Sequence, residues 1–122
     1  MMYHKALLFE DNEIAQKIIL SKSPGEAKDL GRQVRGFNQN TWEKKRFDIV
    51  VQGNILKFSQ NENLKNFLLN TQNRVLVEAS PVDEIWGIGL TKDSEKAKNP
   101  HTWRGLNLLG FALMETRRVL NQ

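Results

Sequence analysis

The sequence predicts a single α+β domain that is mainly helical and contains one short β element. A chain of 122 residues is long enough for one hydrophobic core and too short for two. Apolar residues recur at helical spacing along most of the chain, and several of the predicted helices begin with capping residues. Only the stretch from Val75 to Leu90 departs from that pattern, because two short β-favouring runs flank a polar turn there.

The composition is that of an ordinary globular protein and excludes several functional classes. Hydrophobic residues make up 39% and charged residues 26%, and no apolar run approaches the roughly 20 residues of a membrane span. The chain has no cysteine and no secretion signal, so we expect a cytoplasmic protein without disulfides or a catalytic thiol. Its net charge of +4 favours contact with phosphates without identifying them. No phosphate-binding glycine loop, serine-nucleophile motif or metal-spaced set occurs, so we expect neither cofactor nor metal.

The first ten residues are expected to form the end of a helix, entered without a capping residue. Met2, Ala6 and Phe9 share one face at helical spacing. Lys5 lies among these apolar residues, where a lysine commonly keeps its amine at the helix edge. The missing cap predicts that an upstream segment of the helix is absent from this chain.

Two short helices are expected next. Asp11 is the predicted cap of a helix from about Asn12 to Ser21. A second helix should run from Ser23 to about Gly36, because Ser-Pro-Gly-Glu forms a capping box with proline in the first helical position. Lys28 and Arg32 lie four residues apart on one face of it, where they are either solvated or hold a phosphate.

A longer helix is expected from Asn40 to Gln60, with Glu43 completing a second capping box. The basic run Lys44–Arg46 is either a solvated face or a contact for nucleic acid. Asn61 or Asn63 then caps a short helix. The inward face of the long helix is predicted to hold Trp42, Arg46, Ile49, Val50, Gly53 and Leu56.

The central segment is predicted to hold a buried strand, Val75–Val77, followed by a carboxylate, a turn and a second strand. Pro81 ends the first strand, and Trp86–Leu90 forms the second. Glu78 would be costly to bury unless it is paired or protonated. Together with Asp83 it is either part of a site or a strand end and a turn residue.

The last part of the chain is predicted to be an exposed charged loop and a helix. The loop covers Lys92–Asn99, and the helix opens at His101. Trp103 and Asn107 fall in its first turns, where free backbone donors favour an anion, or else they are a core aromatic and a backbone hydrogen-bonder. The buried side of this helix is predicted to contain Leu106, Leu109, Leu113 and Leu120.

Several of these stretches together resemble one known family, the YbiA-like or NADAR proteins. The most specific matches are EASPVDEIWGIG, residues 78–89, and WRGLNLLG, residues 103–110. The remaining matches are MMYHKA at residues 1–6, the stretch from Ser23-Pro24 to Gly31-Arg32, Trp42, and Lys57-Phe58. The resemblance covers nearly the whole chain, and it places part of the family's N-terminal portion upstream of Met1.

The resemblance implies a compact, mainly helical α+β fold in a single domain over residues 1–122. It also implies an N-glycosidase that hydrolyses the bond between ribose and nitrogen. The substrates implied are phosphorylated ribosylamino-pyrimidine intermediates of riboflavin synthesis, or ADP-ribosylated guanine in nucleic acid. The residues implied are Lys5, Glu78 and Asp83 for catalysis and Trp86, Trp103 and Asn107 for the substrate pocket. We further expect Gly87 to contact the substrate and Arg32 or Lys28 to contact its phosphate.

The chemistry expected of this set requires the amine and the two acids to act on one ribose. The two acids alone predict direct hydrolysis, and Lys5 offers another route, in which apolar neighbours supply a neutral amine that forms a Schiff base with a ring-opened ribose. Glu78 is expected to protonate the leaving base, and Asp83 to steady the cationic sugar or orient water. The alternatives are a non-catalytic module that binds ADP-ribose, a nucleic-acid adaptor using Lys44–Arg46, and an inactive truncated family member.

Overall fold

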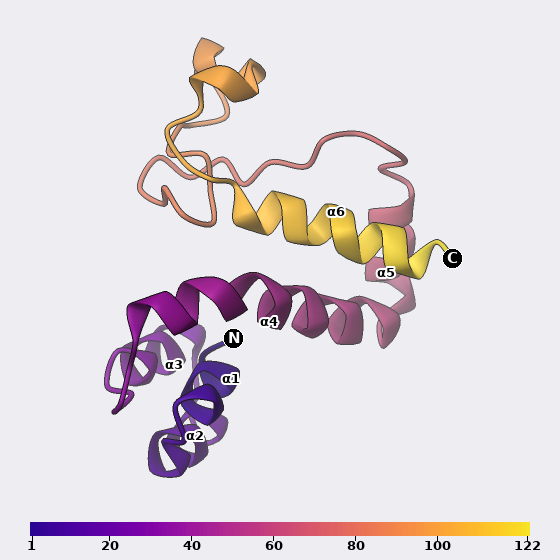
Figure 1. The fold of residues 1–122 in the computed structure, drawn as a ribbon. Helices are drawn as coiled ribbons and strands as arrows, with labels where there is room; N and C mark the ends of the chain where they lie inside the picture. The colour runs from indigo at the N-terminus through magenta and orange to yellow at the C-terminus, as the bar shows by residue number, and fades with distance from the viewer. The chain divides into compact units, whose positions relative to one another are not determined.

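The computed structural model describes all 122 residues, and every regular element in it is helical (Figure 1). The chain divides into two compact units, residues 1–49 and residues 50–122. The elements in chain order are α1 (Met2–Leu8), α2 (Asn12–Ile19), α3 (Pro24–Gly31), α4 (Gln39–Ser59), α5 (Glu62–Leu69), the 3₁₀ helices η1 (Glu95–Lys98) and η2 (Pro100–Thr102), and α6 (Leu108–Leu120). Helix α4 begins in the first unit and ends in the second.

The predicted α+β class is wrong, because the structure contains no strand. The runs around Val75–Val77 and Trp86–Leu90 are joined by a single backbone hydrogen bond, from the Ile88 nitrogen to the Glu78 oxygen at 3.0 Å. A β ladder needs a row of such bonds. Val75 is 60% exposed, so the first run is not the buried segment that its composition predicts. β propensity depends on a packed neighbour, which this run does not have.

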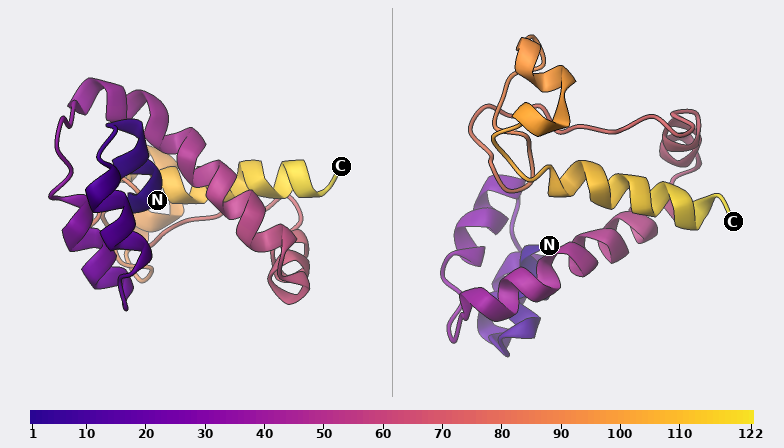
Figure 2. Two further views of the ribbon diagram at one scale, coloured as in Figure 1. Left: turned by 90° about the horizontal axis from the view of Figure 1, so that it is seen from below. Right: turned by 45° about the horizontal axis from the view of Figure 1, so that its top comes forward.

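The first unit is built from helices α1, α2 and α3, which pack against one another (Figures 1 and 2). Gly31 allows α1 and α3 to approach closely, because a Cβ atom at this position would overlap the side chain of Met2. The predicted apolar face of α1 is confirmed, since Ala6 is buried while Met2 and Phe9 pack against the same core. That core consists of Ala6, Ile14, Ala15, Ile18 and Val34.

Three of the predicted helix caps are confirmed. The side chains of Asp11, Ser23 and Asn61 each accept a hydrogen bond from the backbone nitrogen three residues further on, at 3.2, 3.1 and 3.1 Å. The predicted capping box is not closed, because the Glu26 side chain accepts from the nitrogen of Lys22, at 3.1 Å, rather than from that of the cap residue Ser23. Helix α1 has no side-chain cap, as predicted.

Two predicted boundaries in the first unit are wrong. Helix α3 ends at Gly31 rather than near Gly36. Helix α4 begins at Gln39, and the residue whose side chain accepts from its first turn is Asn38 rather than Asn40. Both asparagines are acceptable caps, so local composition does not distinguish between them.

An ion pair between a buried carboxylate and an exposed guanidinium joins the start of α2 to the segment that follows α3. The Asp11 side chain is only 1% exposed, and its oxygens accept from the Arg35 guanidinium at 3.0 and 3.3 Å and from the Arg35 backbone nitrogen at 2.8 Å. These hydrogen bonds hold the pKa of Asp11 well below its usual range. Glu13 also contacts the Arg35 guanidinium, at 3.2 Å.

We expect Asp11→Asn to destabilise the protein at neutral pH, because asparagine keeps the cap and loses the ion pair. The melting temperature at pH 7 should fall by about 4 to 8 °C. A depressed folded-state pKa stabilises the protein above the unfolded-state pKa of about 3.9, and this contribution is lost as the pH falls toward the folded-state pKa. The difference between variant and wild type should therefore shrink below about pH 4.

The control for Asp11 is Asp29→Asn, which removes an exposed carboxylate paired with Arg32. Exposed pairs contribute little to stability, so its melting temperature should stay close to that of the wild type. A loss in Asp11→Asn that is the same at pH 3 as at pH 7 would show that the ion pair is not its cause.

The second unit contains α5 and α6, which pack against each other, and the irregular segment from residue 70 to residue 107. Its buried apolar residues are Val51, Leu68, Ile88, Leu90 and Ala112. The last helix does not open at His101 as predicted, since residues 100–102 form η2 and α6 begins at Leu108. Leu106 is therefore outside the helix and 55% exposed. None of the helices combines the length and the apolar character needed to cross a membrane.

Candidate active site

In the first unit, the predicted nucleophile Lys5 lies against two aromatic rings. Its Nζ is 4.8 Å from the ring centroid of Phe37 and 5.6 Å from that of Trp42. Phe9 contacts Phe37 edge to face, with 5.2 Å between the ring centroids. We call the surroundings of the Lys5 amine, formed by Phe37 and Trp42, the Lys5 niche. Lys5 is half-buried there, and its amine is not paired with a carboxylate.

Burial and a neighbouring cation favour the neutral amine of Lys5 over the ammonium ion. Partial burial lowers the pKa of Lys5, and the nearby Arg32 cation lowers it further. The rings of Phe37 and Trp42 attract the ammonium ion and so act in the opposite direction. A lysine with a lowered pKa is a better nucleophile at neutral pH.

Arg32, the predicted phosphate contact, lies in the same unit as Lys5 and is largely exposed. Its guanidinium contacts Asp29 at 3.0 Å, and 68% of its side chain is accessible to solvent. Lys28 is exposed as well. In the basic run 44–46, Lys44 and Lys45 are exposed, whereas Arg46 is half-buried.

In the second unit, the two sequence motifs are tied to each other by their backbones. The nitrogens of Arg104 and Gly105 both donate to the oxygen of Ile88, at 2.9 and 2.8 Å. Gly105 is necessary for this approach, because a Cβ atom there would overlap the oxygen of Gly87. The EASPVDEIWGIG and WRGLNLLG stretches therefore form one structural unit.

The backbone donors at the start of α6 are already used. The nitrogens of residues 106–109 donate to the oxygens of Glu84, Gly87, Ile85 and Trp86, respectively, at 2.9 to 3.1 Å. These four nitrogens are therefore not free to bind an anion, and the loop of the first motif supplies their acceptors.

Asn107 holds Glu78 in position. It is fully buried, its Oδ1 accepts from the Glu78 nitrogen at 2.9 Å, and its Nδ2 donates to the Leu76 oxygen at 3.0 Å. Its backbone is left-handed, with a φ of 54°. Gly110 makes room for this amide, since a Cβ atom there would lie 2.6 Å from Oδ1. Both functional groups of the Asn107 side chain are thus committed to the backbone.

We expect Asn107→Ala to lower the free energy of unfolding by about 2 to 5 kcal/mol, because it leaves the Glu78 nitrogen and the Leu76 oxygen without partners. Denaturant unfolding measures this loss. Asn107→Gly removes the same amide but suits the left-handed backbone, so a similar loss in both variants would assign it to the hydrogen bonds. Asn121→Ala, at the exposed end of α6, is the control and should change little.

The two predicted carboxylates are both near the surface. Glu78 is exposed, so the expectation that it is buried in an apolar strand is wrong. Asp83 is half-buried, and its Oδ1 accepts from the nitrogens of Ile85 and Trp86 at 3.0 and 2.8 Å. Asp83 therefore stabilises the turn, as predicted by the interpretation of this carboxylate as a turn residue.

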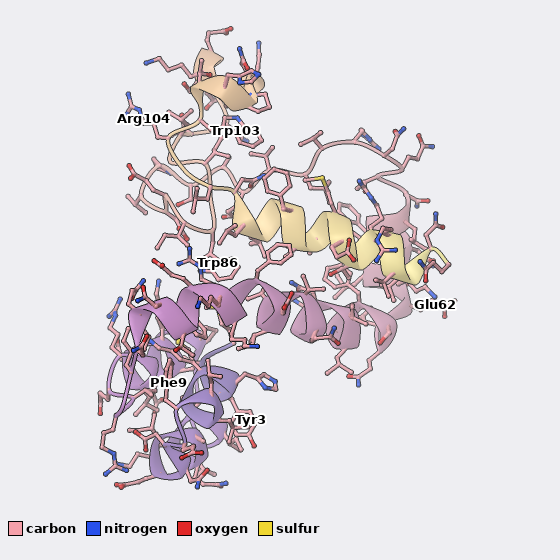
Figure 3. The ribbon with its side chains drawn as sticks, viewed as in Figure 1. Tyr3, Phe9, Glu62, Trp86, Trp103 and Arg104 are labelled. Atoms are coloured by element: carbon pink, nitrogen blue, oxygen red, sulfur yellow. The ribbon has the colours of Figure 1, made fainter.

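The predicted pocket residues Trp86, Gly87 and Trp103 differ in their surroundings. Trp86 is half-buried and follows the Asp83 turn. Gly87 lies where a Cβ atom would be 2.9 Å from the backbone carbonyl oxygens of both Glu78 and Asp83. Trp103 is labelled next to η1 and η2 in Figure 3, and its indole nitrogen donates to the Ala97 oxygen at 2.8 Å.

The structure thus places Arg32 close enough to Lys5 in the first unit to lower its pKa. In the second unit it brings the backbones of Glu78, Asp83 and Gly87 and the side chain of Asn107 together. That all of them act on one substrate stays a prediction. Sequence analysis missed Phe37, which lies outside every predicted helix face. It also missed an apolar hollow next to Glu78, lined by residues from α4, α5 and α6.

Comparison with known proteins gives a family for this arrangement. The model of the NADAR domain matches residues 1–121. The chain is 51% identical to N-glycosidase R617 of Acanthamoeba polyphaga mimivirus, over all of this chain and 72% of that protein. It is 40% identical to the maize riboflavin biosynthesis protein PYRR, over 86% of this chain and 16% of that protein. N-glycosidase YbiA of Shigella boydii is 30% identical, over 97% of this chain and 67% of that protein.

Proposed function

The chain belongs to the NADAR family, whose relatives named above include hydrolases of N-glycosyl bonds, and we propose that it hydrolyses the bond between ribose and nitrogen in a phosphorylated N-riboside. Two substrate classes are proposed, a ribosylamino-pyrimidine of riboflavin synthesis and ADP-ribosylated guanine. The name of the maize relative supports the first. The whole protein's activity is part of this proposal, because the chain spans only part of each relative.

The observation that carries this proposal is the niche of Lys5. An amine beside Phe37 and Trp42, with a pKa lowered by burial and by Arg32, has the properties of a Schiff-base lysine. Of these features, burial and the neighbouring cation favour the neutral amine, whereas a lysine that only keeps its amine in solvent at a helix edge needs neither. Arg32 has a second use here, since its exposed guanidinium is available to a substrate phosphate.

The proposed reaction proceeds through a covalent intermediate on Lys5. The bond between C1′ and the ring oxygen breaks, and the oxygen leaves with the electron pair and takes up a proton to become a hydroxyl. The lone pair of the base nitrogen at the same time forms a double bond to C1′. The neutral amine of Lys5 adds to C1′, and the bond from C1′ to the base then breaks, so that the base leaves with the electron pair and takes up a proton. Water hydrolyses the resulting iminium, releasing the sugar aldehyde and the free lysine.

The carboxylates are proposed to assist these proton transfers. Glu78 donates the proton that the leaving base takes up, and Asp83 balances positive charge on the sugar through Oδ2, the oxygen that is not used in the turn. Glu78 is exposed, so its role as an acid is supported by the family resemblance rather than by burial.

Borohydride reduction tests the covalent route. The enzyme is incubated with each substrate class, reduced, digested and examined by mass spectrometry. We expect the peptide that contains Lys5 to carry the reduced sugar, and chromatography to show release of the free base. Base release without any adduct would contradict the Schiff base and leave a direct hydrolytic route. ADP-ribose binding without base release would favour the non-catalytic module.

We also expect Arg32→Gln to raise the pKa of Lys5, because the neighbouring cation that disfavours the ammonium ion is gone. Less neutral amine is then present at neutral pH. The pH at which the rate of borohydride trapping begins to rise should therefore be higher in the variant than in the wild type. Lys28→Gln, on the same helix, is the control and should leave the profile in place. Matching profiles for the wild type and Arg32→Gln would show that Arg32 does not set this pKa.

A further inference from the structure

The two rings of the Lys5 niche differ in how deeply they are buried. Trp42 is 8% exposed and belongs to the interior of the first unit, whereas Phe37 is 41% exposed. Lys5 on α1 and Phe9 at its C-terminal cap lie four residues apart and share one face of that helix. The Phe37 ring meets both of them, 4.8 Å from the Lys5 nitrogen and 5.2 Å from the Phe9 ring.

The exposed ring of Phe37 is held in place by the residues on either side of it. Before it, the backbone nitrogen of Arg35 donates to the buried carboxylate of Asp11 at 2.8 Å. After it, the side chain of Asn38 accepts from the Thr41 nitrogen at the start of α4, at 3.0 Å. Two fixed neighbours therefore position the ring against the amine, although much of the ring stays in solvent.

Two different cations occupy the Lys5 nitrogen in the proposed reaction, the ammonium ion of the free enzyme and the iminium of the intermediate. The ammonium ion is compact and strongly hydrated, so partial burial against apolar rings costs it part of its hydration. The iminium has one N–H and shares its charge with carbon, so it loses less hydration there. Aromatic rings bind weakly hydrated cations such as quaternary ammonium groups well. Such surroundings therefore suit the iminium better than the ammonium ion.

We infer that the rings of Phe37 and Trp42 stabilise the iminium formed at Lys5 more than the ammonium ion that it replaces. The inference rests on the covalent route of the proposed function and adds these two rings to it. The same iminium forms from a free aldehyde. The aldehyde carbon bonds to the Lys5 nitrogen, and the aldehyde oxygen leaves as water with two protons of the ammonium ion, so the positive charge stays in the niche.

Propanal tests this inference without any N-riboside. The full chain is incubated at pH 7 with increasing propanal, cyanoborohydride reduces the iminium, and mass spectrometry of the digest gives the alkylation rate of each lysine. The half-saturating propanal concentration at Lys5 measures the exchange of ammonium for iminium. Phe37→Leu keeps an apolar side chain and removes the ring, so this concentration should rise at least about threefold. Phe37→Tyr keeps a ring and should restore the wild-type value.

The pKa of Lys5 separates this role of Phe37 from simple burial. A ring that only shielded the amine would, on replacement by leucine, expose the amine and raise its pKa. A ring that attracts the cation has the opposite effect, so Phe37→Leu should lower the pKa of Lys5. The pH dependence of Lys5 acetylation by acetic anhydride measures the shift. A pKa that rises or stays the same, or an unchanged half-saturating propanal concentration, would overturn the inference.

Phe111→Leu is the matched control, since Phe111 is 45% exposed and lies on α6 in the second unit. It should leave both readouts at Lys5 unchanged. The exposed Lys17 is an internal reference in every sample, and its alkylation should not depend on Phe37. Circular dichroism checks that each variant folds.

The role of the rings and the proposed activity fail separately. Iminium formation that depends on Phe37, in a protein that hydrolyses neither substrate class, would keep the inference and reject the activity. Hydrolysis of an N-riboside by a protein whose half-saturating propanal concentration is the same in Phe37→Leu would overturn the inference alone.

Discussion

Lys5→Arg is expected to abolish borohydride trapping and to lower the rate of base release by at least about a thousandfold. Arginine keeps a positive charge against the rings of Phe37 and Trp42, so the niche and the fold should survive. Its guanidinium stays protonated and cannot form the iminium. The substitution therefore removes the nucleophile and keeps the positive charge. Mass spectrometry measures the loss of trapping, and a base-release assay measures the loss of turnover.

The control for Lys5 is Lys17→Arg on α2. Lys17 is exposed and paired with Glu13 at 3.5 Å, and it should tolerate arginine without loss of trapping or turnover. Lys5→Met removes the charge as well and should be equally inactive. Turnover by Lys5→Arg at near the wild-type rate would end the case for a covalent intermediate on this residue.

Gly105→Ala is expected to cause the largest loss of stability in the second unit, at least about 3 kcal/mol. A Cβ atom there would overlap the Gly87 oxygen and would lie 2.8 Å from Glu84 Cα and 2.9 Å from the Ile88 carbonyl carbon. All three neighbours are backbone atoms and cannot rotate away. The strain would also break the hydrogen bond from the Gly105 nitrogen to Ile88. Denaturant unfolding measures the loss.

Gly53→Ala, within helix α4, is the matched control. A Cβ atom at Gly53 would meet nothing within 4 Å. Alanine has the higher helix propensity, so this variant should gain up to about 1 kcal/mol. If Gly105→Ala were as stable as Gly53→Ala, the two motifs would not be held together by backbone contact at residue 105.

The helices of the first unit show what local sequence can predict. Asp11 and Ser23 cap α2 and α3 as expected, because a capping side chain bonds to a nitrogen three residues away. The apolar face of α1 follows from the period of the helix, which requires only neighbours in sequence. The family resemblance also came from contiguous motifs, and the match to the NADAR model over residues 1–121 confirms it.

The central segment shows where local pattern fails. The run Val75–Val77 has strand composition, yet it has no partner strand, and its neighbours are decided by residues about 30 positions away. Asn107 is equally ambiguous in sequence, because a polar residue near a helix start suits an anion or a backbone. The tertiary structure shows that Asn107 binds the backbone, since its side-chain amide forms hydrogen bonds with the Leu76 oxygen and the Glu78 nitrogen.

The sequence by itself determined the starts of α2, α3 and α5, the apolar face of α1 and the family, because these depend on spacing along the chain. Only the tertiary structure placed Phe37 and Arg32 beside Lys5, exposed Glu78 and filled the donor positions at the start of α6. The pKa of an amine and the partners of a backbone donor depend on which atoms lie within a few ångströms, and no local pattern in the chain specifies that.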